Sequence, residues 1–298
     1  MHLIVIVVAL FVERALGQLR RWRDVDGFAR YVALIERSRA GARWLSHPSG
    51  VLVIAPPVLA VALLQWAIEH YLWLGVDLIF GVVVLVLTFG PRDLWEDVYA
   101  LAHARSEADH DRAAACAAAL CRSHSGRPPA DRDGQTIVGA VLVQGHERVL
   151  AVLLWFFVAG PAGAVFYRSV RELPVLAARG TGSRALRRTA TYVHGLAAWI
   201  PARLTALLYA LVGRTGQALA AWPAARAITH ASGAASWRLL AAVGRGALGL
   251  GRGADARTRR RTDEELNDTL LEALGLVSRA LLVALAGLAL LTIFGVLR

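Results

Sequence analysis

An uncharged and mostly apolar run at residues 149–167 dominates the hydrophobic pattern of the chain. Its nineteen residues lie between Arg148 and Arg168. At about 1.5 Å per helical residue the run would be about 28 Å long, close to the hydrocarbon thickness of a bilayer. Pro161, which follows Gly160, cannot donate to the helix ladder, and its ring clashes with the preceding turn. The pattern therefore predicts a central membrane span with a kink or break at this Gly-Pro pair.

Two further apolar runs, 50–68 and 72–90, are joined by a very short turn. Trp66, Tyr71 and Trp73 cluster at that turn. Aromatic side chains gather in this way where a chain leaves the hydrocarbon region of a membrane. The two runs therefore predict a helical hairpin that crosses the membrane twice.

Arginines crowd the outer ends of this hairpin. The positive-inside rule then places the flanking helical segments 18–49 and 91–148 in the cytoplasm. The first of these is amphipathic and basic, which is typical of a helix on the inner membrane surface. Asp77 lies inside the second run and should face protein or water, because a carboxylate in contact with lipid is costly.

The chain begins with an almost wholly apolar stretch, near 1–17, that is interrupted by Glu13 and Arg14. It has no basic start and no clear cleavage site, so a signal peptide is not expected. A short span or a helix partly in the membrane fits better. Glu13 either lies at the interface beside Arg14 or pairs with a charge from another segment, because a carboxylate below the headgroups needs a partner.

Beyond the central run the pattern leaves two topologies open. A basic stretch extends from Arg171 to Arg188, and a full crossing at 149–167 would place it outside, against the charge rule. We expect this crossing, followed by a return through a span near 196–213, because both segments are long enough. The alternative is a re-entrant segment that breaks at the Gly-Pro pair and leaves 168–278 inside.

The composition agrees with a membrane protein. Hydrophobic residues make up 56% of the 298 residues, and the mean hydropathy is +0.49. With a last span near 280–297, the fold class is predicted to be an all-α polytopic membrane protein with cytoplasmic helical segments. We divide the chain into an N-terminal membrane module, 1–167, and a C-terminal arginine-rich helical module, 168–298.

The net charge is +11, and all of the basic side chains counted in it are arginines, because the chain contains no lysine. Arginines beside spans favour topology and anionic lipid headgroups as their role, with an anionic ligand as the alternative. No DNA-reading pattern is present, so no nucleic-acid partner is expected. Cys116 and Cys121 are five apart, which suits neither a redox pair nor a zinc knuckle. We predict no structural metal.

Three carboxylates, Asp93, Glu96 and Asp97, share one face at the start of a helix that follows the hairpin. They favour the positive end of the helix dipole, which is a structural role. Asp93 and Asp97 could instead hold a divalent cation, since Mg²⁺ sites use one or two carboxylates together with phosphate oxygens.

The chain resembles the AmpE family in three segments, which lie in the same order: PRDLWEDV at 91–98, HERVLAVLLWFFVAGPAGAVFYR at 146–168 and WIPARLTALLYALVG at 199–213. Members of this family are multi-pass proteins of the bacterial inner membrane, described as signalling modulators of β-lactamase induction. The wider superfamily includes the CobD/CbiB cobalamin-biosynthesis proteins. Those are membrane enzymes that use ATP to attach an aminopropanol group to a corrin side chain.

Several acidic positions of the synthases are missing from this chain. Their acidic pair and asparagine before the Pro-Ala-Arg motif are His194-Gly195 and Ala198 here, and a later acidic position is Pro174. ATP-driven amide ligation needs carboxylates to hold Mg²⁺ and to manage protons. The lead hypothesis is therefore a non-catalytic regulator, linked to β-lactamase induction and envelope sensing.

Under this hypothesis no residue is catalytic and no cofactor is expected. Charged and polar groups at span ends are plausible switch points, because ion pairs there change strength as the interface moves. The candidate binding residues are Glu13, Arg92, Asp93, Glu96, Asp97, Glu147, Arg148, Tyr167, Arg168 and Arg203. The expected partners are membrane lipid and either a protein or a small anionic ligand.

The alternative is an enzyme of the CobD/CbiB type that binds ATP and Mg²⁺. Asp93, Asp97 and Glu147 would hold the metal ion. Guanidinium groups would bind phosphate, and the candidates are Arg92, Arg148, Arg168 and Arg203. No GxxxxGK[ST] loop is present, which excludes a P-loop ATPase. A third option is a transporter in which Glu13 and Asp77 carry a proton or ion.

Overall fold

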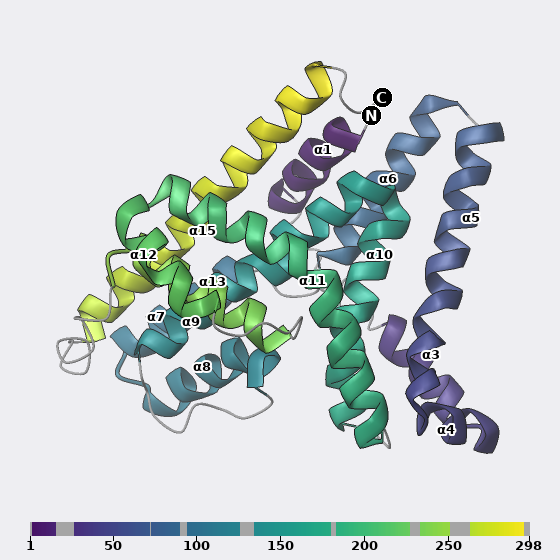
Figure 1. Cartoon of the computed structure of the whole chain (residues 1–298), viewed down its shortest axis with the longest axis horizontal. Helices are drawn as coiled ribbons and strands as arrows, with labels where there is room; N and C mark the ends of the chain where they lie inside the picture. The colour runs from purple at the N-terminus through teal and green to yellow at the C-terminus, as the bar shows by residue number, and fades with distance from the viewer. Residues whose placement is uncertain are drawn as a thin grey trace. The chain divides into compact units, whose positions relative to one another are not determined.

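The structure is a computed structural model. It describes residues 2–15, 27–71, 73–89, 94–125, 134–179, 183–226, 233–250 and 263–294. Within these ranges the chain is almost entirely helical and contains no strand (Figure 1). The predicted fold class, an all-α polytopic membrane protein, is confirmed.

The chain divides into two compact units, each built from two stretches of sequence. Unit 1 comprises Met1–Pro91 and Ala151–Ala197, and unit 2 comprises Arg92–Leu150 and Ala198–Arg298. This division follows contacts in space, whereas the predicted modules 1–167 and 168–298 follow the order of the chain. The sequential division stays a prediction.

The helices of unit 1 are α1 (His2–Ala15), α3 (Gly27–Glu36), α4 (Arg39–Leu45), the 3₁₀ helix η1 (Pro48–Ile54), α5 (Ala55–Tyr71), α6 (Leu74–Thr88), α10 (Ala151–Arg179) and the first part of α11 (Arg184–Val212). Those of unit 2 are α7 (Leu94–Ser106), α8 (His110–Ser125), α9 (Gly134–Gly145), the π-helical turn η2 (His146–Leu150), the second part of α11, α12 (Thr215–Arg226), α13 (Gly233–Ala247) and α15 (Asp263–Ile293).

Among the described residues, four helical stretches are long and apolar enough to cross a membrane: Pro48–Tyr71, Gly134–Ala178, Arg184–Val212 and Glu264–Ile293. Leu3–Val12 and Gly75–Thr88 are shorter apolar helices. The first and last of the long stretches bury little of their surface within the protein. Apolar side chains that the protein leaves uncovered in this way suit contact with lipid hydrocarbon.

The predicted hairpin is present in unit 1, where α5 and α6 pack side by side (Figure 1). Trp66, Tyr71 and Trp73 are all exposed at its turn, as expected for an aromatic belt. In the described part of the predicted surface helix over 18–49, which begins at Gly27, residues 27–45 form two short helices, α3 and α4. Ser38 separates them because its Oγ accepts a hydrogen bond from Gly41 N at 2.9 Å and so caps α4.

The predicted break at Gly160 is confirmed, because Gly160 has φ +62° and ψ −153° inside α10. The rings of Trp155 and Phe166 lie 5.0 Å apart across it, although residues eleven apart in a straight helix are separated by about 16 Å along the axis. Gln65 Oε1 accepts a hydrogen bond from Ala162 N, at 3.3 Å. The second half of α10 therefore takes a new direction, and a side chain of α5 satisfies an amide at the break.

The second half of α10 passes the end of α6 at Arg168. Arg168 Nη1 donates to the carbonyl oxygens of Leu87 and Thr88, at 2.8 and 3.0 Å. Leu186, at the start of α11, lies 3.3 Å from where a Cβ on Gly50 would stand, just before α5 begins. The basic stretch after α10 is thus anchored at the end of the hairpin where α5 starts and α6 finishes.

These contacts bear on the two topologies left open at 149–167, the full crossing and the re-entrant segment, which both stay predictions. Phe156 lies 3.6 Å from the Cβ position of Gly81, which is about 10 Å along α6 from Thr88. Between Phe156 and Arg168 the chain therefore covers only about half of the hairpin. The basic stretch then shares its end of the bundle with the arginines before α5, in agreement with the charge rule.

In unit 2 the helix α9 forms the core, and nearly all of its residues are buried. It packs against α13 and α15, and glycines permit the close approach. A Cβ at Gly145 would stand only 2.7 Å from Val277 on α15, and one at Gly139 would stand 3.2 Å from Ala241 on α13. A helix that is buried along almost its whole length can hold polar groups only where neighbouring helices supply hydrogen-bond partners.

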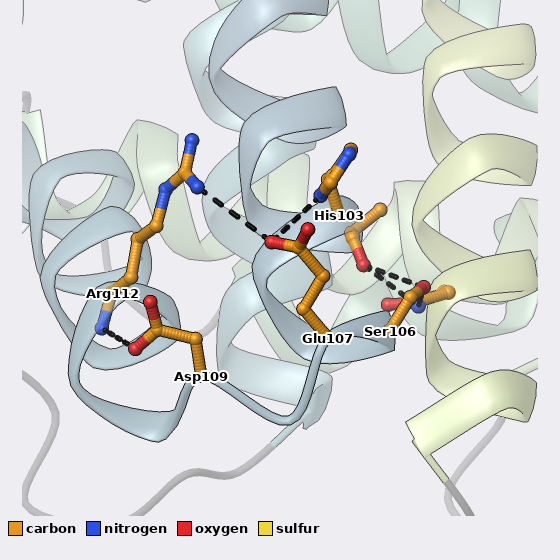
Figure 2. Close-up of polar contacts among 7 residues, drawn as sticks. His103, Ser106, Glu107, Asp109 and Arg112 are labelled. Atoms are coloured by element: carbon orange, nitrogen blue, oxygen red, sulfur yellow. Dashed lines mark hydrogen bonds and ion pairs between the residues drawn. The ribbon is translucent and has the colours of Figure 1, made fainter.

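Polar side chains gather at the turn between α7 and α8 (Figure 2), and those of His103, Glu107 and Arg112 are more than half exposed. Glu107 Oε2 lies 3.0 Å from His103 Nδ1 and 3.7 Å from Arg112 Nη1. Asp109 caps α8 by accepting a hydrogen bond from Arg112 N at 3.0 Å. Asn267 on α15 donates to the carbonyl oxygen of Ala102, which ties α15 to α7.

Candidate functional site

A π-helical turn, His146–Leu150, directly follows α9 in unit 2. Such turns widen the helix by one residue and occur often at functional sites. The turn carries His146, Glu147 and Arg148 in the middle of an otherwise apolar stretch. His146 is completely buried, and Glu147 is only 2% exposed. Each of these three side chains reaches a different neighbouring helix.

Glu147 is in contact with α13. Trp237 Nε1 donates a hydrogen bond to Glu147 Oε1 at 2.9 Å, across 90 positions of sequence. A buried carboxylate is stable only where donors replace its lost hydration. The indole of Trp237 supplies one such donor.

His146 is in contact with α11. Its Nδ1 lies 2.9 Å from Thr205 Oγ1. The donor in this pair is set by the tautomer of the ring, because neutral imidazole and hydroxyl can each donate or accept. Close by, the buried Tyr209 donates its hydroxyl to the carbonyl oxygen of Leu142 at 2.7 Å, so two polar contacts join α11 to the region around the turn.

Arg148 is in contact with α7. Its Nη1 donates to Asp97 Oδ2 at 2.8 Å, and its Nε donates to Gln144 Oε1 at 2.9 Å. Gln144 in turn donates from Nε2 to the carbonyl oxygen of Leu120 on α8, at 3.0 Å. The side chains of Arg148 and Asp97 are 13% and 15% exposed. The guanidinium is therefore held in one orientation by two acceptors from different helices.

Together these residues form what we call the π-turn cluster: Asp97, Gln144, His146, Glu147, Arg148, Thr205 and Trp237. It combines two carboxylates, one guanidinium and one imidazole in a largely buried setting. Such groups can bind anionic oxygens, hold a divalent cation or transfer protons. Ionisable residues in apolar surroundings are costly, so their concentration here makes the π-turn cluster the candidate functional site.

Three of the candidate residues from the sequence, Asp97, Glu147 and Arg148, lie in this cluster. The predicted metal set adds Asp93, which lies outside the described residues, as does Arg92. Among the residues that the structure describes, no group of three or more metal-ligating side chains comes together. The predicted metal site therefore stays a prediction.

The other candidates have local neighbours elsewhere. Arg203 stacks over the ring of Trp199, with Cζ 3.8 Å from the ring centroid. Glu96 is half-buried in the first turn of α7.

In unit 1, Tyr167 is buried with its ring 6.0 Å from that of His194. Arg168 pairs with Glu172 at 2.8 Å, in addition to its bonds to the end of α6. Glu13 belongs to α1, but its side chain lies outside the described part of the chain.

Sequence reasoning did not select Gln144, His146, Thr205 or Trp237. For Gln144 and His146 a signal was present, because they belong to the polar run QGHER inside an apolar stretch. Thr205 and Trp237 had no such signal. They reach the cluster only because α11 and α13 pack beside the turn.

The chain is similar to known proteins over most of its length. The family model described as CobD/Cbib protein matches residues 6–273. A protein of Stutzerimonas stutzeri named "Cobalamin biosynthesis protein CobD" is 31% identical over 251 residues, which cover 82% of this chain and 80% of that protein. A protein of the same name from Chromobacterium violaceum is 29% identical over 265 residues, covering 84% and 81%. No solved structure matches.

These similarities correct the lead hypothesis. A non-catalytic regulator linked to β-lactamase induction is wrong, because the curated relatives are named for cobalamin biosynthesis. The wider resemblance, to the CobD/CbiB superfamily, is confirmed. The narrower resemblance to AmpE stays a prediction.

Proposed function

Since the chain belongs to the CobD/Cbib protein family, we propose that it is a membrane enzyme of cobalamin biosynthesis. The proposed reaction joins an aminopropanol group to a carboxyl side chain of a corrin ring as an amide, with ATP as the energy source. The family resemblance implies this reaction, and the names of two curated relatives support the pathway. We further propose a multi-pass location in the bacterial inner membrane, with lipid as the surrounding partner.

The single observation that carries a catalytic role is the π-turn cluster. A regulator needs no buried carboxylates, whereas amide ligation needs groups that bind phosphate and orient a metal ion. Glu147 and Asp97 are buried or nearly so, and each is held by a donor from another helix. Such fixed side chains are typical of residues whose orientation matters for chemistry.

ATP and Mg²⁺ would be held by residues of this cluster. Mg²⁺ commonly uses only one or two protein carboxylates and completes its shell with phosphate oxygens and water. Glu147 and Asp97 fit that requirement, and Arg148 directly follows Glu147 in the sequence and pairs with Asp97 at 2.8 Å. The bound ATP would supply the activation of the carboxyl group. Glu147 and Asp97 would orient the metal ion, and Arg148 would bind phosphate.

The proposal also explains how the chain could work without the acidic positions that are replaced by His194-Gly195, Ala198 and Pro174. In unit 1, His194 and Pro174 lie on α11 and α10. The carboxylates proposed to act here are on the turn after α9 and on α7 instead. The reaction therefore would depend on Glu147 more strongly than on any residue of unit 1.

The test is amide formation by membranes that contain the full chain. Corrinoid acid, an aminopropanol donor and Mg-ATP are supplied, and the amide product is followed by mass spectrometry. We expect product with the wild-type chain, a loss of at least about a hundredfold with Glu147→Gln, and unchanged product with Glu107→Gln, the matched surface variant. A wild-type chain that forms no product and also fails to restore cobalamin synthesis in a strain lacking its own CobD/CbiB-type protein would overturn the proposal.

A further inference from the structure

We propose that Trp237 is a positioning residue that sets the orientation of the Glu147 carboxylate in the active site. This inference deepens the proposed function and rests on it. The family resemblance pointed to Glu147 and to no residue of α13. The contact between the two side chains is visible only in the folded chain, where 90 positions separate them in sequence.

The backbone around Trp237 is fixed by close packing of α13 on α9. A Cβ on Gly244 would stand 2.6 Å from Leu142, and one on Gly139 would stand 3.2 Å from Ala241. The glycines thus let the two helices approach more closely than other residues would. The indole ring of Trp237, itself partly buried against the core of unit 2, has little freedom to move relative to the turn.

The chemistry of the indole suits this role. Its N–H can only donate, so it cannot take a proton from the carboxylate or accept one. A donor aimed at a carboxylate makes a stronger hydrogen bond than one aimed at a neutral acceptor. With Oε1 held by Trp237 at 2.9 Å, the position of this carboxylate oxygen is restricted before any ligand arrives. Preorganisation of this kind lowers the activation barrier of the reaction and has little effect on the affinity for the ligand.

The first test is Trp237→Phe, which removes the donor and keeps an aromatic ring. We expect kcat for amide formation to fall about ten- to a hundredfold while KM for ATP changes less than about threefold. Trp222→Phe is the matched control, because Trp222 lies on α12 and packs against the same core. It should leave kcat unchanged. Equal losses in both variants would overturn the proposal.

The second test separates positioning from general packing. In a chain that already carries Glu147→Gln, the acceptor is neutral and its orientation no longer matters for metal binding. Trp237→Phe should therefore add no further loss of residual activity in that background. If the two losses instead multiply, Trp237 acts independently of Glu147 and the inference is wrong.

A third measurement does not depend on activity. Thermal unfolding of the detergent-purified wild type, both single variants and the double variant gives the coupling between the two side chains. We expect the shifts in melting temperature to be clearly non-additive, and additive shifts would overturn the contact itself. A wild type without ligase activity but with this coupling would reject the proposed function and keep the contact.

Discussion

The two ends of α7 carry the same kinds of group in different surroundings. Near its start, Asp97 pairs with Arg148 at 2.8 Å, and both side chains are largely shielded from water. Just beyond its end, Glu107 faces Arg112 at 3.7 Å, and these side chains are 52% and 56% exposed. Figure 2 shows the exposed group at the turn into α8. The sequence alone does not distinguish the shielded Asp97–Arg148 pair from the exposed Glu107–Arg112 pair.

The difference is one of solvation. Water screens the exposed pair and hydrates each partner if the other is removed, so such pairs contribute about 0–1 kcal/mol. The buried pair has no such substitute, and losing one partner leaves a charge without compensation. A charged pair in a sequence therefore indicates a function only when the burial of its side chains is known.

The largest expected effect is that of Asp97→Ala. It leaves the guanidinium of Arg148 in a setting that is largely closed to water, and we expect a loss of about 3 kcal/mol in the free energy of unfolding. Chemical unfolding in detergent, followed by far-ultraviolet circular dichroism, measures it. Glu107→Ala is the matched control, with an expected loss below about 1 kcal/mol. Similar losses for both variants would erase the contrast between the two ends of α7.

The next effect is that of Arg148→Lys, which keeps the charge and removes the planar fork. A lysine cannot donate to Asp97 and Gln144 with the geometry of Nη1 and Nε. We expect a loss of about 1–2 kcal/mol, close to the net worth of one hydrogen bond to a charged group. The same unfolding experiment measures it. A fully stable lysine variant would show that charge alone holds this end of α7.

A smaller effect concerns the two thiols of α8, the helix that leads from the exposed turn toward the cluster. Burial raises the pKa of the Cys121 thiol, so less of it is thiolate at any given pH. Cys121 is buried and Cys116 is only partly so. We expect iodoacetamide at pH 8 to modify Cys121 at least about tenfold more slowly than Cys116. Mass spectrometry of the labelled peptides measures both rates, and equal rates would place both thiols in similar surroundings.

The smallest effect is that of Glu107→Gln. We expect a loss of at most about 0.5 kcal/mol at low salt, which disappears near 0.5 M salt because exposed charges are screened. Unfolding at two salt concentrations measures it. A large loss that persists at high salt would mean that the α7–α8 turn is far less open to water than its exposed side chains indicate.

Much of the fold follows from local sequence. The runs 50–68 and 149–167 are apolar enough to require a membrane, and Pro161 after Gly160 is enough to break a helix. The aromatic residues at the hairpin turn mark the membrane surface for the same local reason. These features depend on neighbouring residues, so they can be read before anything is known about distant contacts.

Local sequence did not predict the direction of the chain after the break at Gly160. Length alone made a full crossing at 149–167 as acceptable as a re-entrant segment. The contacts of Arg168 with the end of α6, and of Leu186 near Gly50, show that this part of the chain lies at the end of the hairpin where α5 starts and α6 finishes. These contacts join residues far apart in the sequence, and hydrophobic patterning carries no information about them.

The sequence by itself determined that this is a helical membrane protein, where one of its long helices breaks, and that Glu147 and Arg148 stand in apolar surroundings. Only the tertiary structure decided which partners those charges have, because Trp237 and Asp97 reach them through the packing of α13 and α7 around one π-helical turn. The physical reason is that amphipathic patterns are set by local periodicity, whereas the partners of a buried charge are supplied by whichever helices exclude the water around it.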